Sequence, residues 1–270
     1  MATVGVVGAG KIGELLLSGL LRSGWPADRL VATARRPERG AELSARYGIR
    51  VVDNAGAVAA ADVLAIAVKP QDAGVLMADL GPLLAGHPDR LVISLCAGLP
   101  TSFFAKWLPD GMPVVRVMTN TPALVDEAMT AISAGPFATA EHLALAEEMF
   151  APLGRTIRVP ESQQDAVTAL SGSGPAYFFY LVEAMTDAGI LLGLPRQVAY
   201  DLIVQTAIGS AIMLRDSGEH PVKLREAVTS PAGTTINAIR ELENHGVRAA
   251  MLAALEAARD RATQIAEQQT

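Results

Sequence analysis

Hydrophobic and polar positions follow different periods in the two halves of the chain. In the first half, short apolar runs alternate with stretches of helical spacing, as in TVGVVG followed by KIGELLLSGLLRSG. Runs that are apolar on both faces, each followed by a helix, are typical of a parallel sheet with helices on both sides. The strands predicted in this way are 3–8, 29–34, 62–68, 90–98, 113–118, 130–135 and 155–159.

After Pro160 only the helical period remains. It is broken at SGSGP, GLP, GEHP, SPAG and HG, and the stretch AYFFYLVEAMTDAGILLGL is apolar nearly all round. Such a helix needs cover on all sides, and a bundle of this length covers it poorly alone. We therefore predict an α/β Rossmann-type domain with a parallel-rich sheet (residues 1–160), followed by an all-α dimerisation domain (residues 161–270) and a homodimer.

Composition narrows the class of protein. The 270 residues are 50% hydrophobic and carry a formal charge of −6, which argues against a nucleic-acid partner. No signal peptide and no uninterrupted apolar run of about 18 residues is visible, so we expect a soluble, cytoplasmic protein without a membrane partner. The single Cys96 fits a reducing compartment, where it is expected to be buried. The four histidines show no metal-ligand spacing, and no metal site is expected.

The stretch VVGAGKIG places Gly8, Gly10 and Gly13 between a predicted strand and a predicted helix. In a dinucleotide site the first glycine permits a tight turn, the second lets the backbone approach a pyrophosphate, and the third lets helix and strand pack closely. We expect Gly8, Gly10, Lys11, Ile12 and Gly13 to contact the cofactor. The alternative is a glycine-rich turn without a ligand.

The end of the second strand bears on which dinucleotide is bound. An NAD site usually has an acidic residue there for the ribose, whereas this chain has Arg35 and Arg36 and no acid from Thr33 to Pro37. Guanidinium groups suit a 2′-phosphate, so we predict NADP(H), with NADH as a weaker alternative. The competing interpretation is two solvated surface arginines.

The segment AVTSPAGTTI (227–236) interrupts the helical pattern with small residues that free backbone N–H groups and hydroxyls. One interpretation is helix punctuation alone, with Ser230 as N-cap and Pro231 as the first helical residue. The other is an anion site on those N–H groups.

Seven motifs across nearly the whole chain bear on this choice, because together they resemble one known family. They are VVGAGKIG, AVKPQ, MTNTP, SGSGPAYFF, GLPRQVA, QTAIGSA and LREAVTSPAGTTI. With them the chain closely resembles pyrroline-5-carboxylate reductase. It departs from the family pattern at Thr119, where Pro is usual, and at Ala128 and Ala232, where Gly is usual. None of these departures removes a group needed for hydride transfer.

The resemblance implies reduction of the C=N bond of a cyclic imine carboxylate by NADPH to give L-proline. It implies that Ser230, Gly233, Thr234 and Thr235 bind the substrate, with the Thr235 hydroxyl at the ring nitrogen as the catalytic group. An interlocked helical dimer, and a decamer built from it, are also implied.

The resemblance further places Ala67 and Lys69, which follow a strand in AVKPQ, against the cofactor. Asn120 ends another strand at the same edge and is expected to contact the nicotinamide carboxamide. For Lys69 and Asn120 the competing interpretation is a purely structural role in a turn or loop. We expect Gly172 and Gly174 to be close-approach points, and residues 177–179 to be core.

Two other functions are considered. Another NADP-dependent imine or β-hydroxyacid reductase has a similar plan, but the latter needs a catalytic lysine, and Lys223 is the only lysine in the helical half. A non-catalytic NADPH sensor or scaffold is disfavoured because it has no need of a second anion site.

Overall fold

The structure, a computed structural model, describes residues 1–269 and divides into two compact units. The first comprises residues 1–173 with the end of the chain from residue 258, and the second comprises Gly174–Ala257. The first unit thus extends past the boundary expected at residue 160 and also includes the last part of the C-terminal helix. Its own side-chain contacts, described below, explain the extension.

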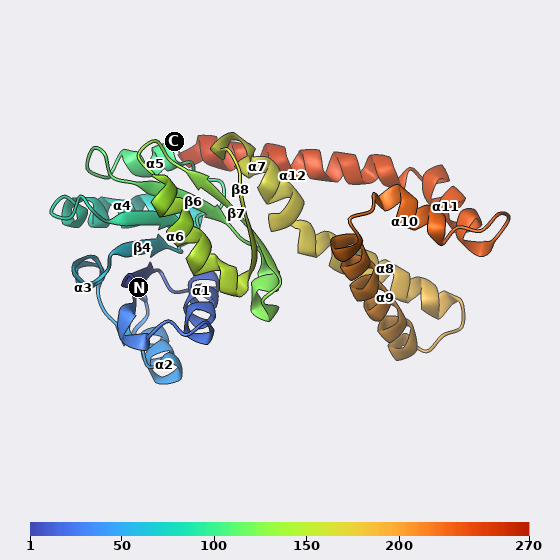
Figure 1. The fold of residues 1–270 in the computed structure, drawn as a ribbon, viewed down its shortest axis with the longest axis horizontal. Helices are drawn as coiled ribbons and strands as arrows, with labels where there is room; N and C mark the ends of the chain where they lie inside the picture. The colour runs from blue at the N-terminus through green and yellow to red at the C-terminus, as the bar shows by residue number, and fades with distance from the viewer. Residues whose placement is uncertain (270) are drawn as a thin grey trace. The chain divides into compact units, whose positions relative to one another are not determined.

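The first unit is built on one sheet of eight strands in the order β3-β2-β1-β4-β5-β6-β7-β8 (Figure 1). The strands are β1 (Val4–Val7), β2 (Leu30–Ala32), β3 (Arg50–Val51), β4 (Val63–Ile66), β5 (Leu91–Ser94), β6 (Val114–Met118), β7 (Ala128–Ala134) and β8 (Gly154–Arg158). The first six pair in parallel, in the order of doubly wound dinucleotide-binding folds. The predicted parallel-rich sheet is confirmed.

The apolar pattern did not predict the strand β3 or the direction of the strand β7. The edge strand β3 is only two residues long, which is too short to stand out as an apolar run. It pairs with β2 in the register that sets Arg50 opposite Val31. β7 runs antiparallel to β6, and β8 then runs parallel to β7. The link between β6 and β7 holds only the short 3₁₀ turn η2 (Thr121–Val125), with no crossover helix.

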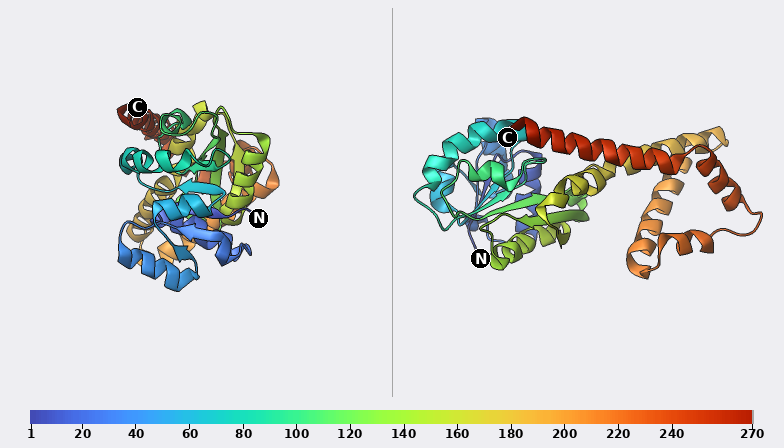
Figure 2. Two further views of the ribbon diagram at one scale, coloured as in Figure 1. Left: turned by 90° about the vertical axis from the view of Figure 1, so that its left-hand side faces the viewer. Right: turned by 90° about the horizontal axis from the view of Figure 1, so that it is seen from above.

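Helices cover both faces of the sheet, as Figures 1 and 2 show. On one face lie α1 (Lys11–Arg22), α2 (Pro37–Tyr47) and α6 (Ala140–Phe150), and on the other α3 (Asn54–Ala60), α4 (Pro70–Leu84) and α5 (Thr101–Ala105). The first core includes the fully buried Leu16 and Phe150, and the second includes Met77 and Phe104. Burial of such side chains stabilises by about 1.5–3 kcal/mol each and holds the strand ends in place.

A buried arginine joins the sheet to the segments beyond residue 160. Arg116 on β6 is 5% exposed and pairs with Glu161 at 3.8 Å and Asp165 at 3.2 Å. Glu161 accepts hydrogen bonds from the Thr101 backbone N–H (2.6 Å) and hydroxyl (2.7 Å), and the Thr263 hydroxyl donates to Asp165 (3.0 Å). These contacts place η4 (Glu161–Gln163), α7 (Gln164–Val167) and the end of α12 (Val247–Gln269) in the first unit.

The SGSGP motif coincides with a π-helical turn, η5 (Thr168–Gly172), that ends the first unit. A Cβ on Gly172 would lie 2.4 Å from Met118 Cε, so the predicted close approach of a helix to the sheet is confirmed there. A Cβ on Gly174 would meet nothing within 4 Å. The same prediction is therefore wrong for Gly174.

The second unit contains α8 (Gly174–Leu191), α9 (Arg196–Ser217), α10 (Pro221–Ala227), α11 (Thr234–Asn244) and the first turns of α12. The predicted breaks at GLP, GEHP, SPAG and HG fall between successive helices. α8 and α9 pack closely, because a Cβ on Gly189 would lie 2.7 Å from Ala199 Cβ.

Among its described residues this unit has almost no core of its own. Only Gly174 and Thr186 of α8 and Ala199 of α9 are buried, and none in α10 or α11. Phe178 and Phe179 are 67% and 68% exposed. The expectation that they form core is therefore wrong for a single chain, since no neighbouring helix of that chain covers them.

α9 is long and apolar, although Asp201 and Arg215 interrupt it, so it holds no uninterrupted apolar run of about 18 residues. By length and composition it could cross a membrane, and 6% of its apolar window is buried. It is the single helix of this kind within residues 1–269. A helix whose apolar surface packs against another protein chain meets the same criteria.

Candidate active site

The carboxyl ends of β1, β2 and β4 meet at one edge of the sheet. β1 lies between β2 and β4, so the glycine turn after β1 is flanked by the residues that follow both neighbours. The strand order reverses between β1 and β4, and ligands of open α/β sheets bind at such a switch point. The sequence motifs GAGKIG, TARR and AVK all belong to this edge.

The backbone of the turn accounts for each glycine. Gly8 has φ +81°, and a Cβ there would lie 2.2 Å from Val68 Cγ1. A Cβ on Gly13 would lie 2.8 Å from Val6 Cγ1, so this glycine lets α1 pack on β1. Around Gly10, by contrast, a Cβ would have only the Gly8 carbonyl oxygen within reach, at 3.9 Å. The space at Gly10 is open to a ligand.

The N-terminus of α1 suits an anion. Gly10 is its N-cap, and no side chain caps the first turn. The N–H groups of that turn and the helix dipole therefore favour a bound pyrophosphate. Lys11 is exposed, whereas Ile12 is half-buried against the core. Ile12 can therefore contact a bound pyrophosphate through its backbone N–H but not through its side chain.

Two residues that the sequence did not single out hold the turn. The Gly8 N–H donates to the Thr33 hydroxyl (3.1 Å), and the Ala9 N–H donates to the Thr33 carbonyl (2.9 Å). The Arg39 Nε donates to the Ala9 carbonyl (3.3 Å). Thr33 lies near the end of the strand predicted at 29–34, just before the two arginines, which is the one sequence signal that pointed to it.

Arg35 and Arg36 follow β2 at this edge and are exposed. Arg35 is 89% exposed, and its Nη1 lies 3.9 Å from Asp72 Oδ2. Arg36 is the N-cap of α2. The structure thus places two exposed cations beside the glycine turn.

Ala67 and Lys69 lie beside the same turn. Ala67 is half-buried, and its Cβ would be 3.3 Å from a Cβ on Gly13. Lys69 is exposed and is the N-cap of α4.

Asn120 is fastened by the protein itself. Its amide Nδ2 donates to the Ser171 carbonyl in η5 (3.0 Å), and its Oδ1 accepts from the Met129 N–H (3.0 Å). The side chain therefore links the end of β6 to β7 and to the π-helical turn. One amide N–H is left over for a ligand.

Cys96 lies at the end of β5 and is buried, as predicted. Burial raises the pKa of its thiol to about 11, although hydrogen bonding with the Ser94 side chain and the Val68 backbone opposes the change. A thiol with that pKa is protonated at neutral pH and is a poor nucleophile.

In the second unit, residues 230–233 form a tight turn before α11. The Gly233 N–H donates to the Ser230 carbonyl (3.1 Å), with Pro231 second and Ala232 third in the turn. Ala232 has φ +57°, a conformation that third positions of type II turns need and that glycine adopts most easily. A Cβ on Gly233 would lie 2.3 Å from Ser230 Oγ, so a larger residue there would require the Ser230 hydroxyl to move.

This geometry rules out the simple capping interpretation. Gly233, not Ser230, is the N-cap of α11, and no side chain caps the helix. Thr234 and Thr235 are its first two residues, Thr234 exposed and Thr235 half-buried. The first-turn N–H groups and two hydroxyls are thus presented together, as an anion site requires.

Comparison with known proteins covers both units. The family described as NADP oxidoreductase coenzyme F420-dependent matches residues 3–98, and pyrroline-5-carboxylate reductase dimerisation matches residues 161–265. A pyrroline-5-carboxylate reductase of Mycobacterium tuberculosis is 44% identical over 98% of this chain and 97% of its own length. One from Methanosarcina acetivorans is 42% identical over 97% of both chains. The chain belongs to the pyrroline-5-carboxylate reductase family.

Solved structures agree with this membership. A pyrroline-5-carboxylate reductase from Coxiella burnetii has a TM-score of 0.91 and 34% identity over 98% of both chains. The Plasmodium falciparum pyrroline carboxylate reductase, solved with NADP bound, has a TM-score of 0.88 and 26% identity over 98% of both. The resemblance inferred from the motifs and the predicted fold class are confirmed.

Two of this reductase's departures from the family pattern lie around β7. The Thr130 hydroxyl donates to the Thr119 hydroxyl (2.9 Å), an interaction that a proline at position 119 could not make. Ala128 begins β7 and is buried, and a Cβ on Gly154 would lie 2.3 Å from its carbonyl oxygen. The chain thus accommodates Ala128 at the start of β7 and Thr119 directly after β6.

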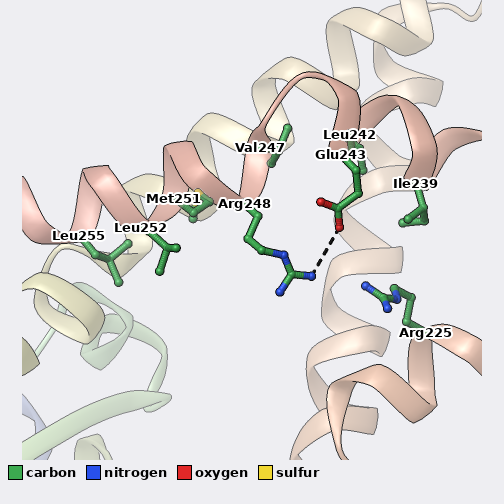
Figure 3. Close-up of a pocket in the computed structure, with 9 residues that line it drawn as sticks. All are labelled: Arg225, Ile239, Leu242, Glu243, Val247, Arg248, Met251, Leu252 and Leu255. Atoms are coloured by element: carbon green, nitrogen blue, oxygen red, sulfur yellow. Dashed lines mark hydrogen bonds and ion pairs between the residues drawn. The ribbon is translucent and has the colours of Figure 1, made fainter.

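The helical unit of this reductase also has a pocket of about 440 Å³ (Figure 3). It lies along the end of α11 and the start of α12 and is mostly apolar. Its lining residues are Arg225, Ile239, Leu242, Glu243, Val247, Arg248, Met251, Leu252 and Leu255. Ser230, Gly233, Thr234 and Thr235 are not among them, so the pocket is not the expected substrate segment. Among residues 1–269, no three His, Cys, Asp or Glu side chains gather as they would around a metal ion.

Proposed function

We propose that this protein reduces the C=N bond of 1-pyrroline-5-carboxylate with NADPH to give L-proline, the last step of proline biosynthesis. The observation that carries the proposal is full-length similarity, at 44% identity, to a protein of that name, together with a helix start in each unit that no side chain caps. The cofactor, when bound, supplies the hydride that reduces the imine carbon.

The first unit is proposed to hold the cofactor. The N–H groups of Lys11, Ile12 and Gly13 bind the pyrophosphate beside the open space at Gly10, above the tight turn at Gly8. Arg35 and Arg36 pair with the 2′-phosphate and favour NADPH, with NADH as a weaker alternative. Support comes from the NADP-bound Plasmodium falciparum relative and from the lack of an acid at the end of β2.

Ala67, Lys69 and Asn120 are proposed to line the rest of the cofactor site. Ala67 and Lys69 lie at the switch point, where a dinucleotide crosses the sheet edge. Asn120 has one free amide N–H to donate to the nicotinamide carboxamide, because its other hydrogen bonds are internal.

The second unit is proposed to hold the substrate. The Ser230 hydroxyl and the N–H groups of Thr234 and Thr235 bind its carboxylate beside Gly233 at the start of α11, and the Thr235 hydroxyl meets the ring nitrogen. An imine nitrogen takes its proton from water, so no side chain with a strongly shifted pKa is needed. The reaction therefore depends on orientation more than on acid–base catalysis.

The assembly is proposed to be a homodimer in the cytoplasm, with a decamer as a higher form. Support comes from the match to the dimerisation family and from the exposed apolar helices of the second unit. The apolar surface of α9 is then covered by a second copy and not by lipid. Net negative charge disfavours a nucleic-acid partner.

The alternatives have less support. Lys223 is exposed and pairs with Glu219 at 3.0 Å, unlike the catalytic lysine of a β-hydroxyacid reductase. A pure NADPH sensor has no use for the uncapped start of α11.

One assay tests the function directly. NADPH absorbance is followed with pyrroline-5-carboxylate, with a β-hydroxyacid, and with no substrate. We expect turnover only with the imine, and L-proline as product. Binding of NADPH without turnover would favour the sensor, and oxidation or reduction of β-hydroxyacid substrates would favour the related dehydrogenase.

A second experiment tests the cofactor choice. Replacing Arg35 and Arg36 by alanine should weaken NADPH binding by about 1.5–3 kcal/mol and leave NADH binding nearly unchanged, because only NADPH carries the 2′-phosphate. Steady-state kinetics with both cofactors measures this. Equal losses for NADPH and NADH would contradict the assignment.

A further inference from the structure

Glu14 places a carboxylate where the proposed cofactor site needs positive potential. It lies in the first turn of α1, and its backbone N–H donates to the Gly10 carbonyl (2.9 Å), one turn from the pyrophosphate end. A helix N-terminus is equivalent to about half a positive charge. A full negative charge one turn away would cancel it.

Three donors surround that carboxylate. Arg39 Nη2 is in direct contact with Glu14 Oε2, and Arg46 Nη1 (3.0 Å) and the Tyr47 hydroxyl (2.8 Å) donate to Oε1. Burial alone would raise the pKa of Glu14, but the hydrogen bonds from Arg39 and Tyr47 and the two guanidinium charges outweigh it and lower the pKa. Glu14 is therefore ionised and paired.

Arg39 also reaches the glycine turn itself. Its Nε donates to the Ala9 carbonyl (3.3 Å), and its Nη1 pairs with Glu42 (2.8 Å) on its own helix. The Arg39 side chain is only 18% exposed, compared with 63% for Arg46. Since the Ala9 N–H is held by Thr33, both ends of this residue are fixed from the β2–α2 segment.

We propose that Arg39 is a positioning residue for the dinucleotide turn. It holds the Ala9 carbonyl away from the ligand side and neutralises Glu14, so that the α1 N-terminus keeps its attraction for the pyrophosphate. The inference rests on the proposed NADP(H) site. It differs from the role of Arg35 and Arg36, because the pyrophosphate is common to NADPH and NADH.

The test measures cofactor binding on the full-length protein by calorimetry, so turnover is not the only readout. Arg39→Met should raise the Kd of NADPH and of NADH by a similar factor, about tenfold, since the carboxylate then loses its more buried guanidinium partner and its negative charge is less well neutralised beside the anion. The double variant Glu14→Gln, Arg39→Met should return both Kd values to within about threefold of wild type, because the repulsive charge is gone.

Arg46→Gln is the matched control. Arg46 pairs with the same carboxylate but is mostly exposed, and Ala9 is held by Arg39, so the loss should stay below about threefold. Glu14→Gln alone should tighten both cofactors, which keeps the inference testable should Arg39→Met fail to fold.

Several outcomes would overturn the inference. A loss confined to NADPH would make Arg39 a 2′-phosphate ligand, and equal losses in the single and double variants would remove Glu14 from the account. Unchanged cofactor affinity in Arg39→Met, or in Glu14→Gln, would also contradict the inference. Wild-type protein that binds neither cofactor would overturn the NADP(H) site itself, a separate and recognisable failure.

Discussion

Ala232 holds a backbone conformation that alanine adopts at a cost. Its φ of +57° lies in the left-handed region, where an L-residue other than glycine loses about 1–2 kcal/mol. Part of that is offset because glycine is more flexible in the unfolded chain. Ala232→Gly should therefore increase the free energy of unfolding by a net of about 0.5–1 kcal/mol, which would raise the melting temperature slightly. It should also lower the KM for the imine substrate.

Ala238→Gly is the control for that prediction. Ala238 is an exposed residue inside α11, where glycine should destabilise by about 1 kcal/mol. Opposite shifts in melting temperature for the two variants would support the strained turn, and a loss in both would contradict it.

Thr235 is the residue on which the proposed chemistry depends most. Loss of its hydroxyl removes a hydrogen bond to the ring nitrogen, so Thr235→Ala should lower kcat/KM by roughly 10- to 100-fold. Thr235→Ser should restore most of the activity, and NADPH affinity should hardly change. Steady-state kinetics, cofactor binding and melting temperature on the same preparations measure this.

Thr229→Ala is the matched comparison, since the Thr229 hydroxyl donates within the protein to the Arg225 carbonyl (2.6 Å). It should change stability and leave kcat/KM near wild type. Normal turnover in Thr235→Ala would remove this residue from the mechanism.

At the residue scale, the sequence predicted the groups whose role is set by local backbone. Gly8 and Gly13 could be identified because a turn and a close helix–strand contact both require glycine. Thr33 and Arg39 could not, because their partners Gly8 and Ala9 are 25 and 30 positions away and are brought close only by strand pairing.

At the scale of elements, Glu14 ties α1 to α2, and this tie depends on pH. The folded pKa of Glu14 is lowered from its ordinary value of 4.5, so its contribution is complete above that value and is lost as pH falls through the folded pKa. Glu14→Gln should lower stability at neutral pH by at most about 1 kcal/mol, because the pair is partly exposed.

Urea unfolding at neutral and acidic pH checks this. The difference between wild type and Glu14→Gln should shrink as the medium becomes more acidic than the folded pKa. A difference that stays constant with pH would show that the carboxylate charge is not what joins the two helices.

The elements themselves were predictable to different degrees. β1, β4 and β5 are apolar on both faces and stand out from the sequence. The direction of β7 depends on its connection, and the link from Met118 to Ala128 is too short for a crossover helix. That signal was present in the sequence, whereas β3 is too short to leave one.

For the whole molecule, the apolar surface of the helical unit predicts self-association. Phe179→Asp, at a site 68% exposed in the single chain, should shift the protein from dimer toward monomer and lower activity, because a charge would be buried between copies. Analytical ultracentrifugation and activity on the same sample measure this.

Val75→Asp is the control, since Val75 is 82% exposed on α4 of the first unit and should leave assembly unchanged. A monodisperse, active monomer of the wild-type protein would contradict the prediction. The sequence supported a dimer because α8 is apolar nearly all round. The sequence pattern predicted a domain boundary at residue 160. It could not reveal that Arg116 pairs with Glu161 and Asp165, because hydrophobic periodicity carries no signal of an ion pair between distant residues.

The return of α12 to the first unit has a consequence for synthesis. Ile265 Cγ2 would lie 3.1 Å from a Cβ on Gly98, and Ala262 is buried, so the first unit is completed by residues that are translated after the helical unit. The apolar helices of residues 174–257 leave the ribosome before that. The nucleotide-binding unit of a nascent chain therefore cannot be complete until the apolar helices of the second unit have already been synthesised.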